Sequence, residues 1–172
     1  MKPNKILLAL AAPLLFAATL PVFAQEPVVG VANPESLFSD PDPKLNANKQ
    51  VALRIMRELL QCNHWDEADK WLTERYIQHN PNVASGRAGV VAFFSSTRQR
   101  TPTCDKLETP IVAVLADDDL VTVVLPREYP DPRDSSKTYT TTWFDMWRIV
   151  DGKADEHWDP ATIAPPPAPE RC

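Results

Sequence analysis

Residues 144–159 read Phe-Asp-Met-Trp-Arg-Ile-Val-Asp-Gly-Lys-Ala-Asp-Glu-His-Trp-Asp and contain the strongest fold signal of the chain. Runs that contain β-branched and aromatic residues flank Asp151-Gly152, and an Asp-Gly pair between such runs is a strong hairpin signal. We therefore predict one strand over residues 137–150 and a final strand over residues 153–159.

The register of this hairpin follows from its loop. If Asp151 and Gly152 form a two-residue loop, Val150 pairs with Lys153, and this pair sets the pairing of all other residues in the two strands. Asp145 then lies opposite Trp158, and Trp147 lies opposite Glu156. These side chains share one face of the sheet, on which we also expect Trp143, Ile149 and Ala154.

An aromatic and aliphatic face that carries two carboxylates, Asp145 and Glu156, indicates a pocket. Two such acids would be partly desolvated and would repel each other, which raises the pKa of at least one of them. The alternatives are a solvent-exposed face or acids held in salt bridges with arginines. In this register His157 and Asp159 lie on the opposite face, and only a β-bulge or the end of the strand brings them into the pocket.

The residues upstream predict three helices followed by a second hairpin. Apolar residues recur at helical spacing over residues 46–62, again after Asn63 up to Tyr76, and over residues 87–99. β-branched runs at residues 109–116 and 120–125 then predict two strands, followed by a loop at residues 129–136. Three helices before four antiparallel strands predict an α+β fold, with the helices on one face of a curved sheet.

The two ends of the chain differ from this domain in amino-acid composition. Residues 1–24 have the lysines, apolar run and small residues of a signal peptide cut after Ala24, which predicts a secreted or periplasmic protein. Residues 25–45 are predicted to be an extended lead-in, residues 46–160 the domain, and residues 161–172 a Pro-rich tail. Cleavage moves the formal net charge from −5 to −7, which disfavours nucleic acid as a partner, and no later segment is apolar enough for stable membrane insertion.

Three cysteines remain in a compartment that permits disulfides. A Cys62–Cys104 disulfide is one expectation, and pairing of Cys172 with either residue or with another chain is the alternative. The cysteines and the three widely separated histidines match no metal-binding spacing, so we expect no metal. Phosphate-binding loops, nucleophile elbows and Cys-x-x-Cys motifs are missing, which disfavours kinase, hydrolase and redox chemistry.

Several motifs together resemble the SnoaL-like polyketide cyclase family of the nuclear transport factor 2-like superfamily. They are Tyr-Ile-Gln-His-Asn-Pro at residues 76–81, Gly86-Arg87, Phe93-Phe94, residues 144–153, and Glu-His-Trp-Asp at residues 156–159. The resemblance covers residues 46–160. It implies a cone-shaped roll, in which three N-terminal helices pack on a strongly curved antiparallel sheet around a pocket.

The resemblance also implies a reaction. The characterised cyclases of this family catalyse an intramolecular aldol condensation without metal or cofactor, and Asp159 matches the aspartate that acts as acid and base. Asp145 matches a second polar pocket position, which is often histidine in the cyclases, and we expect His79 to support the acids. The residues expected to bind a small apolar or carbonyl-containing substrate are Tyr76, Asn80, Trp147, Glu156, His157 and Trp158.

Two functions fit these observations. One is a cofactor-independent lyase, isomerase or cyclase that acts on a small carbonyl compound. The alternative is a non-catalytic ligand-binding or dimerisation module of the cell envelope. A homodimer is expected in either case, because the outer face of the predicted strand carries apolar and uncharged side chains at Thr140, Thr142, Phe144 and Met146.

Overall fold

The structure, a computed structural model, describes residues 26–97 and 99–163. The predicted signal peptide and residues 164–172 of the predicted tail lie outside the described residues. The described elements, in chain order, are η1 (Pro34–Phe38), α1 (Pro43–Arg54), η2 (Ile55–Gln61), η3 (Trp65–Lys70), β1 (Leu72–Gln78), α2 (Arg87–Ser95), β2 (Ala113–Asp117), β3 (Leu120–Asp131), β4 (Asp134–Val150) and β5 (Lys153–Trp158).

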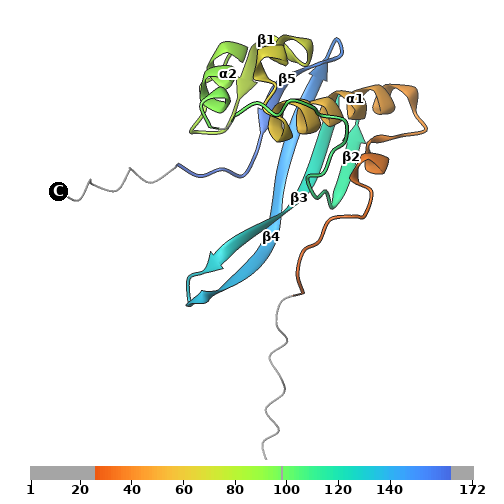
Figure 1. The fold of residues 1–172 in the computed structure, drawn as a ribbon. Helices are drawn as coiled ribbons and strands as arrows, with labels where there is room; N and C mark the ends of the chain where they lie inside the picture. The colour runs from red at the N-terminus through yellow and green to blue at the C-terminus, as the bar shows by residue number, and fades with distance from the viewer. Residues whose placement is uncertain (1–25, 98, 164–172) are drawn as a thin grey trace, which may run out of the picture.

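The strands form one five-stranded sheet with the order β1-β5-β4-β3-β2. The predicted α+β class is confirmed: helices pack on a curved sheet (Figure 1). The expectation of a purely antiparallel sheet is wrong, because β1 pairs with β5 in parallel. Two parallel strands need a long connection between them. The chain between β1 and β5 contains α2 and the strands β2, β3 and β4, so it is long enough for β1 to pair in parallel with β5 at the edge of the sheet.

The first helix begins at a well-defined cap. The Asp42 side chain accepts hydrogen bonds from the backbone N–H groups of Lys44 and Leu45, and Pro43 occupies the first turn. The helix continues directly into η2, a wider π-type segment. The buried side of α1 and η2 packs against the sheet. The core between them includes Val51, Ala52, Ile55, Met56, Leu59, Leu72, Val121, Val123, Trp147 and Ile149.

The segment predicted as a second helix divides into two elements. Residues 65–70 form the short 3-10 helix η3, and residues 72–78 form strand β1, so the helical prediction for the second half was wrong. Leu72 and Tyr76 are the two buried residues of β1, and an irregularity in its pairing with β5 lies between Leu72 and Ile77. This irregularity gives the strand a four-residue spacing of buried positions, which resembles the period of a helix.

Two predicted boundaries also change. The residues predicted as an extended lead-in contain η1 and the start of α1, and Phe38 is fully buried in the core. The predicted loop at residues 129–136 is mostly strand, because β3 and β4 pair from Leu120 to Asp131 with only a tight turn between them. The far end of this hairpin projects away from the helices (Figure 1), and stacking of Tyr129 on Tyr139 stabilises it.

A β-bulge sets the register of the last hairpin. Asp151 and Gly152 form the predicted loop, both with positive φ (49° and 74°), and Val150 pairs with Lys153. Beyond Ile149 the register shifts by one residue, so Trp147 pairs with His157 instead of Glu156. The predicted pairing of Asp145 with Trp158 was therefore wrong.

The extra residue of the bulge is Asp155, whose side chain is held by β1. It accepts hydrogen bonds from the Thr73 hydroxyl (2.7 Å) and from Arg75 Nε (2.8 Å). The Arg75 guanidinium holds the pKa of Asp155 below its usual range. Because Asp155 is 4% exposed, these charge-assisted contacts satisfy a buried carboxylate and fix the bulge in place.

Cys62 and Cys104 form a disulfide, the pairing expected from the sequence. It joins the end of η2 to the segment that follows α2, near the backbone hydrogen bond from Thr101 to the carbonyl of Cys62 (2.9 Å). Within the described residues, no helix combines the length and apolar character needed to cross a membrane.

Candidate functional site

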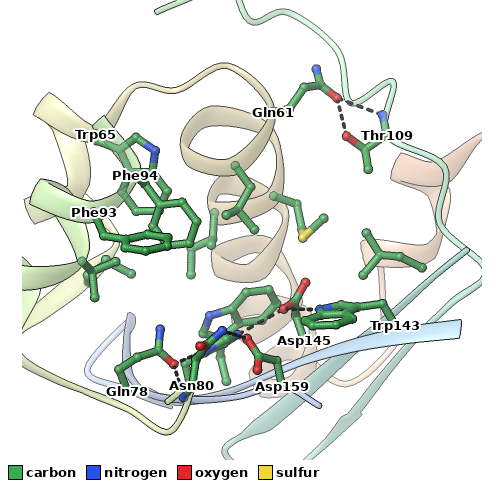
Figure 2. Close-up of a pocket in the computed structure, with 18 of the residues that line it drawn as sticks. Gln61, Trp65, Gln78, Asn80, Phe93, Phe94, Thr109, Trp143, Asp145 and Asp159 are labelled. Atoms are coloured by element: carbon green, nitrogen blue, oxygen red, sulfur yellow. Dashed lines mark hydrogen bonds and ion pairs between the residues drawn. The ribbon is translucent and has the colours of Figure 1, made fainter. Parts of the chain in front are cut away.

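A cavity of about 500 Å³ lies between the helices and the sheet, with walls from η2, η3, α2 and strands β1, β3, β4 and β5 (Figure 2). Most of its lining is apolar and includes Met56, Trp65, Leu72, Val90, Phe93, Phe94, Leu125, Trp143 and Trp147. Its volume is in the range of small-molecule pockets. Polar side chains gather at the wall formed by β1, β4 and β5.

Asp145, His157 and Asp159 form the centre of this polar wall. Each offers an oxygen or nitrogen atom, and these atoms lie within 4.8 Å of one another. The β-bulge is the reason for their proximity, because it turns His157 onto the same face as Asp145 and Trp147. Three titratable groups therefore meet at one end of an otherwise apolar cavity.

The neighbouring amide of Gln78 fixes the tautomer of His157. The backbone N–H of Asn80 can only donate a hydrogen bond, and it lies 3.1 Å from Gln78 Oε1. The same oxygen lies 2.6 Å from His157 Nδ1. Because an amide oxygen can only accept, Nδ1 carries a proton and donates a hydrogen bond to Gln78 Oε1.

The other ring nitrogen of His157 faces Asp145. Nε2 lies 3.2 Å from Asp145 Oδ1, which also accepts a hydrogen bond from Trp143 Nε1 (3.2 Å). Since Nδ1 is already protonated, a hydrogen bond here needs one further proton, carried either by Nε2 or by the carboxyl group. The side chains of His157 and Asp145 are 8% and 13% exposed, so the contact between them is largely shielded from solvent.

Asp159 is held in place by two donors. Its Oδ2 accepts a hydrogen bond from Asn80 Nδ2 (2.7 Å), and its Oδ1 accepts one from the backbone N–H of Ala161 (2.9 Å). The orientation of Asn80 is itself fixed, because its Oδ1 accepts from the backbone N–H of Asn82 (2.9 Å). The carboxylate is thus positioned at the wall of the cavity (Figure 2), with an oxygen within 4.8 Å of a His157 ring nitrogen.

Tyr76 and Trp147 form the floor beneath the polar wall. Trp147 Nε1 donates a hydrogen bond to the Tyr76 hydroxyl (3.0 Å), and both residues are almost fully buried. Burial raises the pKa of Tyr76 far above its usual value, so its hydroxyl stays neutral. The Trp147 ring also lies 5.4 Å from the His157 ring, which restricts the position of the imidazole.

The structure places three of the predicted site residues outside the cavity. Glu156 and Trp158 point to the opposite face of β5, because the bulge reverses the alternation that the sequence predicted. His79 lies with them: it stacks on Trp158 at 5.0 Å and pairs with Glu156 at 2.9 Å. The hydrogen bond with His79, supported by one from Arg148, lowers the pKa of Glu156. This arrangement gives His79 and Glu156 a structural role on the outer face.

The other predicted residues, Tyr76, Asn80, Asp145, Trp147, His157 and Asp159, all line the cavity. Two further lining residues, Gln78 and Trp143, were not among the predicted site residues although each contacts an acid–base group. Gln78 follows Tyr76 by two positions, so the two side chains share a face once β1 is recognised as a strand. In the predicted helix, residues two positions apart do not share a face, so Gln78 was not grouped with Tyr76.

Several solved structures are similar to this chain. A SnoaL-like protein from Jannaschia sp. CCS1 is 17% identical, with 71% of this chain and 91% of that chain covered and a TM-score of 0.49. An NTF2-like protein of unknown function from Burkholderia pseudomallei is 15% identical, with coverages of 67% and 91% and a TM-score of 0.47. An LEH-like epoxide hydrolase from M. tuberculosis is 12% identical, with coverages of 66% and 80% and a TM-score of 0.46.

A search of curated protein sequences found no match. The model of the SnoaL-like domain matches residues 53–157, from Leu53 near the end of α1 to His157 in β5. This span is more than half of the 172 residues. The chain therefore belongs to the SnoaL-like domain family, within the NTF2-like superfamily.

Proposed function

We propose that this protein catalyses a cofactor-independent proton transfer at the carbon next to a carbonyl group, as in an aldol condensation, cyclisation or isomerisation of a small apolar compound. The observation that carries the proposal is the position of Asp145, His157 and Asp159 at one end of an apolar cavity. Such chemistry needs a base, a donor for the developing enolate oxygen and exclusion of water.

Asp159 is the base in this scheme. Its carboxylate removes the α-proton of the substrate, and the electron pair of the C–H bond moves into the carbonyl group to form an enolate. The proton shared by His157 and Asp145 stabilises the enolate oxygen, and Gln78 Nε2 is a further donor. That amide nitrogen points away from Asn80 (Figure 2) and has no hydrogen-bond partner among the described residues.

The second half of the reaction returns the proton. In an aldol condensation the enolate carbon attacks a second carbonyl carbon, and the new alkoxide takes the proton from Asp159. In an isomerisation the proton returns to a different carbon of the same substrate. Both routes restore the carboxylate of Asp159 and the proton shared by His157 and Asp145.

Solvent exchange tests this proposal without knowledge of the natural substrate. Simple ketones such as acetophenone and 4-acetylbenzoate are incubated with the protein in D₂O, and loss of the methyl proton signal is followed by NMR. We expect exchange above the buffer rate, unchanged by EDTA. Binding without exchange would favour the alternative, a non-catalytic binding module, and exchange that EDTA abolishes and Zn²⁺ restores would contradict the metal-free mechanism.

Export to the periplasm or the medium remains part of the proposal, supported by the composition of residues 1–24. We predict that protein isolated from these compartments begins at Gln25 and carries the Cys62–Cys104 disulfide. Intact-mass and peptide mass spectrometry without reduction measure both features. A chain that retains Met1, or free thiols at both cysteines, would be the opposite result.

We also propose a homodimer formed through the outer face of the sheet. Phe144 is 43% exposed and Leu115 is 59% exposed, and Met146 shares their face: it follows Phe144 by two residues on β4 and is separated from Leu115 by Thr122 of β3. Light scattering at micromolar concentration should give twice the mass of the chain, and Phe144→Glu should shift it to the monomer. A monomeric wild-type protein would remove this proposal.

A further inference from the structure

We infer that the natural substrate carries a carboxylate, bound by Arg127 at the mouth of the cavity, in addition to the carbonyl group that reacts. This inference deepens the proposed function and rests on it for the position of the carbonyl. Arg127 lies on β3 and lines the same cavity as Asp145, His157 and Asp159. No other lysine or arginine lines this cavity within the described residues.

Arg127 differs from the other described arginines in its lack of a partner. The guanidinium groups of the others donate to a carboxylate or to a backbone carbonyl, and these arginines are Arg54, Arg57, Arg75, Arg87, Arg100, Arg133 and Arg148. Among the described residues, the Arg127 side chain makes no hydrogen bond or ion pair, and it contacts an aromatic ring. Its donors are therefore available to a ligand.

That interaction holds the guanidinium in place. The central carbon of the guanidinium lies 4.4 Å from the centre of the Trp143 ring, a cation–π arrangement. A guanidinium stacked on a ring keeps its N–H groups free at the edge, where they match the two oxygens of a carboxylate. The stack restricts a long, flexible side chain before the ligand arrives, which lowers the entropic cost of binding.

Trp143 also connects the two ends of the site. Its face supports Arg127, and its Nε1 donates to Asp145 Oδ1, the oxygen that faces His157. A substrate whose carboxylate contacts Arg127 would therefore extend past Trp143 toward the acid–base wall. The expected class is a small keto acid with an apolar or aromatic body between its carbonyl and its carboxylate.

A matched pair of probes tests this inference. 4-Acetylbenzoate and methyl 4-acetylbenzoate share a ketone and a ring, and they differ in the charge of the group opposite the ketone. We expect the wild-type protein to bind the acid more tightly, and Arg127→Gln to weaken its binding by about tenfold or more, the effect of losing one charge-assisted contact. Binding of the methyl ester should change by less than about twofold. Calorimetry or NMR titration measures both dissociation constants.

Arg133→Gln is the matched control, because Arg133 lies near the tip of the same hairpin and pairs with Asp131 outside the cavity. It should leave the binding of both probes unchanged. Equal affinities of the wild-type protein for acid and ester, or equal losses in Arg127→Gln, would overturn the inference. A loss in Arg133→Gln as large as that in Arg127→Gln would do the same.

The exchange assay separates failure of this inference from failure of the proposed function. Binding of the acid that depends on Arg127, without exchange of its methyl protons, would support the carboxylate site and contradict the catalytic proposal. Exchange that proceeds equally well with acid and ester, in wild type and in Arg127→Gln, would support catalysis and contradict the carboxylate site.

Discussion

Replacement of Asp159 by asparagine should reduce the rate of α-proton exchange by about 10²-fold or more, because a positioned general base contributes that much. The melting temperature should stay within about 2 °C of the wild type, since the asparagine oxygen can still accept the hydrogen bond from Ala161 or from Asn80. Exchange monitored by NMR and thermal unfolding monitored by circular dichroism measure the two effects.

Glu156→Gln is the matched control for this variant. Glu156 lies three residues before Asp159, but its side chain is on the outer face of β5, where it pairs with His79 and Arg148. Its exchange rate should stay within about twofold of the wild type. An unchanged rate in Asp159→Asn would transfer the role of the base to Asp145, and unchanged rates in both Asp159→Asn and Asp145→Asn would contradict acid–base catalysis in this cavity.

The second large effect is expected at His157. His157→Phe keeps a ring against Trp147 but removes both nitrogens, so the shared proton is lost and the Asp145 carboxylate loses one partner. We expect exchange to slow by about 10²-fold. The free energy of unfolding should fall by about 1–3 kcal/mol, because polar groups of Gln78 and Asp145 lose a partner in a largely buried position.

His79→Phe provides the comparison, because both histidines belong to the motifs that resemble the SnoaL-like family. His79 is 43% exposed and lies outside the cavity, so its replacement should change the exchange rate by less than about twofold. A larger loss of exchange in His79→Phe than in His157→Phe would contradict the assignment of the two histidines to opposite faces.

The sequence predicted the fold class and part of the site because those features depend on local patterns. The Asp-Gly loop fixed the start of the last hairpin, and the alternation of β4 placed Trp143, Asp145 and Trp147 on one face. These two inferences need only the geometry of a regular strand, in which alternate side chains share a face.

The errors at the site come from two irregularities that alternation does not reveal. The pairing shift in β1 produced a helix-like spacing of Leu72 and Tyr76, and the bulge at Asp155 reversed the faces of Glu156, His157 and Trp158. Each irregularity is stabilised by contacts between distant segments. The carboxylate of Asp155, for example, binds Thr73 and Arg75 of β1, about eighty residues earlier in the chain, and such a contact leaves no local pattern.

The bulge brings His157 and Asp145 together in the cavity, and we propose that one proton is shared between them. A long-range ¹H–¹⁵N NMR spectrum of the imidazole rings tests it most directly, because it reports which ring nitrogens carry protons. We predict that His157 Nδ1 is protonated, as its contact with Gln78 requires, and that Asp145→Asn changes the Nε2 signal. A His157 whose Nδ1 carries no proton, or whose Nε2 signal does not respond to Asp145→Asn, would contradict this proposal.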